Sequence, residues 1–232
     1  EHRPAVNMPY NPPYYVNLVE ATGHVKEQDL SAFLWELGAQ LSERVARLAQ
    51  RANGNHDIRI RSMDRHNLLA EVRLVKEIYE EAWKDNWGFV PMTSDEINEM
   101  ASVMKWISDL DLSFFVYYKD EPVAVCLILL DINPLLQRLD GKIGISGLLK
   151  ILRYRHEITG ARLVLFGIRK SHQKIRHAFP FVAIEHLFRL GSAKHQYVEL
   201  GWILEENEAI KQMARELGAR LYKRYRIFRK SW

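Results

Sequence analysis

The chain has 232 residues, of which 47% are hydrophobic and 11% aromatic, enough apolar material for one large core or for one core with an appendage. Its net charge of +4 is a modest excess that suits an anionic ligand as well as weak nucleic-acid contact. The single cysteine, Cys126, excludes a disulfide framework, and the longest uncharged apolar run, Pro122–Leu130, is far too short to cross a bilayer. We therefore expect a globular protein of the reducing cytoplasm, without a leader peptide and with Cys126 in its core.

The N-terminal part is predicted to be an appendage. Met8–Tyr15 (MPYNPPYY) has three prolines in five residues, which forbid a regular helix. From Glu27 to Ala52 the apolar residues keep close to a heptad spacing, which predicts one amphipathic helix. This helix is either an arm packed on its own domain or a surface that binds a partner or a second copy. Asn53–His56 (NGNH) breaks the pattern, so we predict an N-terminal segment over residues 1–56 and a main domain over 57–232.

The first half of the main domain alternates strand and helix patterns. Asp57–Ser62 reads as a half-buried strand, and Leu68–Trp83 as a helix with a broad apolar face. Thr93 and Glu96 form a capping box that opens a second helix. Two further strands, Leu112–Tyr118 and Pro122–Leu130, are joined by a charged turn and predict a hairpin.

A short insertion follows the hairpin. Asn133 is predicted to cap a short helix that begins at Pro134, and the apolar residues of Leu148–Leu152 suggest another helix. Tyr154–His156 is interpreted either as a basic patch or as a solvated helix end.

The second half has the order strand, loop, helix, strand, helix. The strands are Ala161–Arg169 and Tyr197–Leu204, and the second helix is stopped by Gly218. Pro180 stands in the first turn of the first helix, where a missing N–H is tolerated. Tyr222–Lys230 alternates aromatic and basic residues, and we interpret it as a strand with a basic edge rather than as a nucleic-acid contact.

This order of elements resembles the GNAT acetyltransferase superfamily. In that family the loop after the fourth strand reads Gln/Arg-x-x-Gly-x-Gly/Ala, and here the matching stretch runs from Gln173 to Ala178, with Arg176 in place of the first glycine. The phrases NWGFVPM, LDIN, WILEEN and YKRYRIF look like a poorly characterised bacterial subgroup. The resemblance implies an α/β fold with a mixed, mostly antiparallel sheet flanked by helices, here with an N-terminal helical arm.

The resemblance also implies a function, acyl-CoA-dependent transfer of an acetyl or other acyl group to an amine of a small molecule or peptide. The residues that it assigns to acetyl-CoA or another acyl-CoA are Gly167, Ile168, Gln173, Lys174, Arg176, His177, Ala178 and Asn207. Those that it assigns to the acceptor are Trp87, Phe89 and Trp202; the alternative for Trp87 and Phe89 is that they plug the edge of the core. An arginine at position 176 is expected to crowd the approach of pyrophosphate to backbone N–H groups, and hence to weaken acetyl-CoA binding. Ala214 stands where many members place a tyrosine thought to protonate the leaving thiolate.

Acyl transfer to an amine needs a base, and Glu199 is the best candidate. Alternation along the strand places Glu199 and Gly201 on one face, and Leu200 and Trp202 on the other. Glu205, at the end of the same strand, is a second candidate for a catalytic role, or simply favours the dipole of the following helix. The histidines lack metal-ligand spacing, so no metal is predicted.

Two alternatives to a CoA-dependent enzyme stay open. A GNAT fold with a damaged cofactor loop could serve as a binding or assembly module, or the acyl donor could be a carrier protein. No nucleic-acid partner and no membrane span are expected, and a homodimer is possible.

Overall fold

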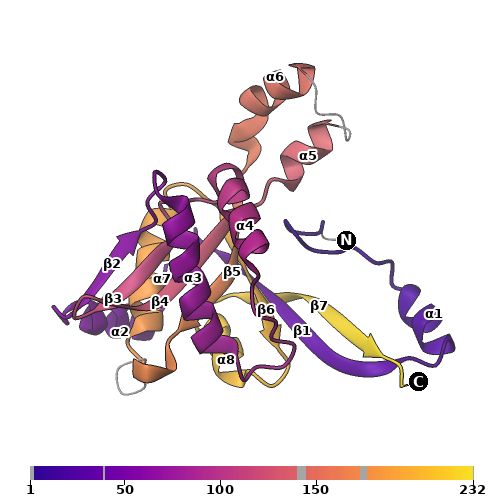
Figure 1. Ribbon diagram of the computed structural model, residues 1–232, viewed down its shortest axis with the longest axis horizontal. Coiled ribbons are helices and arrows are strands. Elements are labelled where there is room, and N and C mark those ends of the chain that lie inside the picture. Colours follow the sequence, from indigo (N-terminus) through magenta and orange to yellow (C-terminus); the bar gives the residue numbers. More distant parts are fainter. Residues whose placement is uncertain (1–2, 39, 140–144, 173–176, 232) are drawn as a thin grey trace.

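The computed structural model describes residues 3–38, 40–139, 145–172 and 177–231, and its centre is one seven-stranded sheet (Figure 1). The strand order is β2-β3-β4-β5-β6-β1-β7, and every neighbouring pair is antiparallel except β5 and β6. The strands are β1 Val25–Glu36, β2 Ile58–Ser62, β3 Phe114–Tyr118, β4 Glu121–Leu130, β5 Gly160–Ile168, β6 Tyr197–Leu204 and β7 Arg220–Arg229. The predicted mixed, mostly antiparallel sheet is confirmed.

Helices cover both faces of this sheet. They are α1 Tyr15–Ala21, α2 Glu43–Asn53, α3 Leu68–Trp83, α4 Ser94–Ile107, α5 Asn133–Leu139, α6 Ile145–Tyr154, α7 Phe179–Gly191 and α8 Glu208–Glu216, with 3-10 turns η1 Arg155–Glu157 and η2 Lys170–His172. The capping box of Thr93 and Glu96 is present at the start of α4, and Gly218 follows the end of α8 with φ +77°.

The two faces of β3 and β4 belong to two separate cores. Phe114 and Cys126 pack into the core covered by α2 and α7, whereas Phe115 and Val125 pack against α3 and α4. Successive side chains of a strand point to opposite faces, so both cores are built from the same two strands. Cys126 is fully buried, as predicted, and burial raises the pKa of its thiol.

The single helix predicted over Glu27–Ala52 is wrong. Residues 25–36 form β1, which lies inside the sheet between β6 and β7, and only Glu43–Asn53 is helical. A strand that is buried on both faces has a nearly continuous apolar sequence. Leu30 and Phe33 of β1, with Leu37 just after it, are buried in this way, and their spacing resembles that of a heptad repeat. Because β1 completes the main sheet, the structure argues against a boundary that makes residues 1–56 an appendage.

The N-terminal segment before α1 lies against the sheet rather than hanging free. Ala5, Val6 and Met8 are buried, and the Arg162 guanidinium donates to the carbonyl of Val6 at 2.7 Å. Asn133 was expected to cap α5, but it is the first residue of that helix and its side chain donates to the carbonyl of Pro4 at 2.6 Å. The Asp131 carboxylate instead accepts from the Asn133 backbone N–H.

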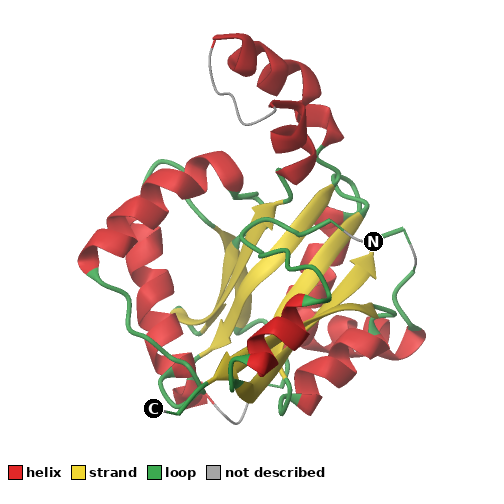
Figure 2. Ribbon diagram, turned by 90° about the vertical axis from the view of Figure 1, so that its right-hand side faces the viewer, coloured by secondary structure: helices red, strands yellow, loops and turns green. Residues whose placement is uncertain are grey.

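Helices α5 and α6 project from the body of the molecule, at the top of Figures 1 and 2. They connect the end of β4 to the start of β5 and pack on each other and on η1. Among the described residues, no helix has both the length and the apolar character that crossing a bilayer requires.

Candidate functional site

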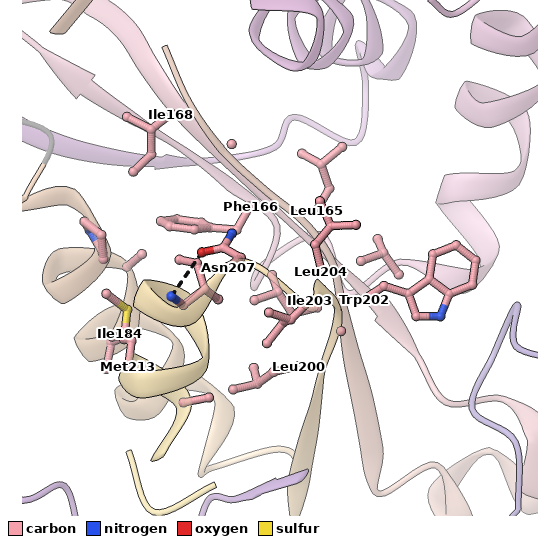
Figure 3. Close-up of a pocket in the computed structure, with 18 of the residues that line it drawn as sticks. Leu165, Phe166, Ile168, Ile184, Leu200, Trp202, Ile203, Leu204, Asn207 and Met213 are labelled. Atoms are coloured by element: carbon pink, nitrogen blue, oxygen red, sulfur yellow. Dashed lines mark hydrogen bonds between the residues drawn. The ribbon is translucent and has the colours of Figure 1, made fainter. Parts of the chain in front are cut away.

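The candidate site is a cavity at the point where β5 and β6 separate. The two strands pair in parallel from Gly160 and Tyr197 as far as Leu163 and Leu200. Beyond that pair a cavity of about 320 Å³ lies between the strands, with α7 and α8 beside it (Figure 3). Trp83 and Asn86, from the end of α3, reach the cavity across the sheet, so elements from both faces line it.

The strand edges that face the cavity are free of a partner strand in the described pairings. β5 continues to pair with β4 out to Ile168, and β6 with β1 out to Leu204, but each pairs only on its outer side. The backbone N–H and C=O groups on the inner edges need hydrogen-bond partners. An extended ligand that carries amide groups, lying between the strands, would supply them.

The lining is mainly apolar, with the side-chain amides of Asn86 and Asn207 as its polar groups. The apolar side chains shown in Figure 3 include Leu165, Phe166, Ile168, Ile184, Leu200, Ile203, Leu204 and Met213. The side-chain oxygen of Asn207 accepts from the Ile210 backbone N–H, and this hydrogen bond caps α8. A Cβ on Gly167 would lie 2.5 Å from Cζ3 of Trp83. The glycine therefore allows the indole ring to close one side of the cavity.

A buried ionic cluster lies next to the point where the strands part. Arg162 and Glu199 are paired neighbours on β5 and β6, with 3.0 Å between Nε and Oε1. Nζ of Lys223, on β7, lies 3.7 Å from the other oxygen of Glu199. Only 1% of Glu199 is exposed. Burial raises the pKa of this carboxyl more than the charges of Arg162 and Lys223 lower it, so its pKa is above the ordinary value.

Residues 3–8 cover this cluster from outside. The carbonyls of Arg3 and Val6 accept from Lys223 and Arg162, respectively. Residues 3–8 thus shield the Glu199 carboxylate from solvent on this side. The cavity lies on the other side of the strand pair.

Trp202 is on the Glu199 side of β6, contrary to the alternation predicted from the sequence. Its ring contacts Tyr225 edge-on, and the guanidinium of Arg162 lies 5.8 Å from the ring centroid. In Figure 3 the indole ring points away from the other cavity residues. The register of β6 against β1 shifts between Leu200 and Ile203, and a bulge of this kind reverses the alternation of side chains.

The residues assigned to acyl-CoA are brought together only in part. Gly167, Ile168 and Asn207 line the cavity. His177 is exposed and Ala178 is the residue before α7, and neither lines the cavity. Gln173, Lys174 and Arg176 lie outside the described residues, so their contact with pyrophosphate stays a prediction.

Trp202 borders the cavity, but the other two expected acceptor residues and the second carboxylate lie elsewhere. Trp87 is exposed and Phe89 packs on Tyr79 with 5.3 Å between ring centroids. Neither lines the cavity, although Asn86 beside them does. Glu205 pairs with Lys26 at 2.6 Å beyond the end of β6, and it does not line the cavity.

Sequence reasoning missed Arg162 and Lys223 as partners of Glu199. Arg162 carries the one charge within the strand Gly160–Ile168, and a lone charge in an apolar strand is a usable signal for a buried ion pair. Lys223 gives no such signal because the strand around it is basic throughout. Among the described residues no group of three or more His, Cys, Asp or Glu side chains is placed to hold a metal ion.

No protein-family model matches the chain. It is 30% identical over 233 residues to "Protein YghO" of Escherichia coli (strain K12), an alignment that covers 98% of this chain and 59% of that protein. It is also 30% identical over 234 residues to "Bacterial ceramide synthase" of Caulobacter vibrioides, covering 98% of this chain and 60% of the relative. The chain thus spans about three fifths of the length of these curated relatives.

Among solved structures, the GCN5-related N-acetyltransferase from Sphaerobacter thermophilus superposes with a TM-score of 0.58 at 16% identity. The superposition covers 94% of this chain and 56% of that chain. The chain therefore has the fold of the GNAT N-acetyltransferases.

Proposed function

We propose that the chain is an N-acyltransferase domain that takes its acyl group from an acyl-CoA bound in the cavity between β5 and β6. The observation that carries the proposal is the separation of the parallel strand pair into an apolar cavity lined by groups from both faces of the sheet. The fold supports acyl transfer as the class of reaction.

The residues present fit such a donor. The inner edges of β5 and β6 offer backbone partners to the amides of an extended chain, and the apolar side chains suit a hydrocarbon arm. When bound, acyl-CoA supplies an activated thioester. The amine nitrogen forms the new C–N bond, the C–S bond breaks, and the sulfur leaves as a thiolate. The backbone of the strands holds the carbonyl in place for this attack.

Glu199 is the proposed base. It lies one position before Leu163 and Leu200, the last pair before the strands separate, and so is next to Leu200 of the cavity. Its raised pKa favours uptake of the proton that the ammonium group must lose near neutral pH. Trp202, 53% exposed beside Arg162, is the proposed surface on which the acceptor approaches, with local displacement of residues 3–8. Glu205, Trp87 and Phe89 have no part in this proposal.

The name of one relative suggests which acceptor to test first. Ceramide is a long-chain amine acylated on nitrogen, and a relative carries the name "Bacterial ceramide synthase". We therefore place long-chain amino alcohols ahead of peptide amines as acceptors of this chain.

The test combines donor binding with turnover. Calorimetry should show that the chain binds acyl-CoA. Met213→Trp places a larger side chain in the cavity and removes space for the ligand, so it should weaken acyl-CoA binding at least about tenfold. Gln212→Trp is the matched control, because Gln212 is exposed on the same helix. Unaltered binding by both variants would contradict the site.

Glu199→Gln should leave donor binding unchanged and lower turnover by roughly 10²–10⁴-fold. A fully active Gln variant would remove Glu199 from the mechanism. If the unmodified chain binds no acyl-CoA at all, the proposal fails, and the alternative of a binding module gains support.

A further inference from the structure

We propose that one end of the molecule docks on an anionic lipid surface. This end consists of α5, α6 and the last turn of α4, and we call it the docking end. The inference stands on its own observations and does not depend on acyl transfer.

The three elements lie at the same end of the sheet. Helices α5 and α6 lie between the end of β4 and the start of β5, and they stand clear of the body in Figures 1 and 2. Ser108, the residue that follows α4, forms an isolated bridge with Leu129, at the end of β4. The last turn of α4 therefore ends where the chain leaves the sheet for α5.

Large apolar side chains are exposed at this end. Trp106 is 75% exposed, Leu149 65% and Leu136 44%. Along α6 (ISGLLKILRY) the apolar positions 145, 148, 149 and 152 recur at the spacing of one helix face. A single exposed leucine needs no explanation, but a tryptophan and leucines from three helices gathered at one end suggest a surface that something covers.

The charge of the same end is positive. Residues 133–158 contain five Lys and Arg against two Asp and Glu, and the whole chain has a net charge of only +4. Arg153 and Arg155 are exposed, and the ammonium group of Lys105 lies 5.2 Å from the centroid of the Trp106 ring. Basic side chains therefore lie at the same end of the molecule as the exposed apolar side chains.

This combination fits the interface of an anionic membrane better than an acidic protein. Tryptophan and leucine insert at the level of the headgroups, while the long Lys and Arg side chains reach the phosphates. Each basic residue near an anionic surface contributes roughly 1 kcal/mol to binding. Because no described helix is long and apolar enough to span a bilayer, the expected mode is attachment at the surface.

The full chain should co-sediment with vesicles of phosphatidylcholine and phosphatidylglycerol at about 70:30. Binding should be at least about tenfold weaker on pure phosphatidylcholine, and equally reduced in about 0.5 M NaCl, because salt screens the attraction between basic residues and headgroups. Equal binding to both vesicle types, or no binding to either, would overturn the proposal.

Variants locate the contact. Trp106→Glu combined with Leu149→Glu should lower binding to the mixed vesicles at least about tenfold. Val90→Glu is the matched control and should bind as the unmodified chain does, because Val90 is 68% exposed but precedes the start of α4, whereas Trp106 lies in the last turn of that helix. Thermal unfolding of each variant verifies that it is folded. Retained binding by the folded double variant would overturn the proposal and leave a protein partner as the occupant to test.

Discussion

At the scale of single residues, the ion pair of Arg162 and Glu199 shows how burial decides the role of a charge. Both side chains are buried, and burial lowers the pKa of Arg162 as it raises that of Glu199. Removing two charges from water is costly, and their mutual attraction offsets that cost only while both are present. The pair therefore matters most when one partner is lost.

We expect Arg162→Met to lower the free energy of unfolding by roughly 3–5 kcal/mol, because it leaves the Glu199 carboxylate buried without its nearest countercharge. The double variant Arg162→Met, Glu199→Met should recover most of this loss. Urea unfolding of the unmodified chain and of both variants measures it. A double variant that is less stable than Arg162→Met would contradict this account.

Asp109 carries a second prediction, for pH. Its carboxylate accepts from Nε2 of His195 at 3.0 Å and from the Leu112 backbone N–H. Burial raises the pKa of Asp109, but the bond from His195 and the charge of Lys194 lower it more, so the folded-state pKa lies below the unfolded value of about 3.9. The stability that Asp109 contributes is thus present above that value and is lost as pH falls through the folded-state pKa.

We expect the difference in unfolding free energy between the unmodified chain and Asp109→Asn to shrink as pH falls from about 5 to about 2. Asp120→Asn is the control, since this exposed side chain should give a small difference that hardly changes with pH. If the difference in unfolding free energy between the unmodified chain and Asp109→Asn did not change with pH, the Asp109 carboxylate would not contribute the expected stability.

At the scale of elements, local patterns were predictable and strand order was not. The capping box of Thr93 and the strand, helix, strand, helix order after Gly160 follow from neighbouring residues, and both are confirmed. The position of β1 depends on pairing with β6 and β7 far along the chain, which periodicity does not report. The separation of β5 from β6 and the bulge that turns Trp202 are decided by the same long-range pairing.

Removal of β1 is the decisive test at this scale. We expect a chain truncated to residues 53–232 to fail to fold cooperatively, because β6 and β7 lose the strand that joins them and the core loses Phe33 and Trp35. This reverses the expectation of a separable arm. Far-UV circular dichroism and thermal unfolding measure the outcome.

A chain that keeps residues 24–232 is the control for this truncation. It loses residues 3–8 and α1 but retains β1, so it should still unfold cooperatively, with lower stability because Ala5, Val6 and Met8 no longer cover the cluster. A cooperative transition for residues 53–232 would restore the domain boundary at Asn53–His56.

At the scale of the whole molecule, the cavity joins parts that otherwise belong to different layers. Trp83 comes from the helix layer on one face, Met213 from α8, and Leu200 from the sheet itself. A ligand held by all three adds contacts that the folded chain alone lacks. Because it binds only the folded state, it stabilises the whole fold by about 2.7 kcal/mol at 100 times its dissociation constant.

The apolar lining predicts how this stabilisation depends on the donor. Each additional methylene group buried in the cavity should contribute about 0.8 kcal/mol, which is roughly fourfold in the dissociation constant, until the space is filled. We therefore expect affinity to rise from acetyl-CoA to butyryl-CoA to hexanoyl-CoA, measured by calorimetry and by the shift in melting temperature. Met213→Trp should flatten this series and Gln212→Trp should not. The same affinity for all three donors in the unmodified chain would mean that the acyl chain lies outside the cavity, and that the lining holds only the part of the donor that they share.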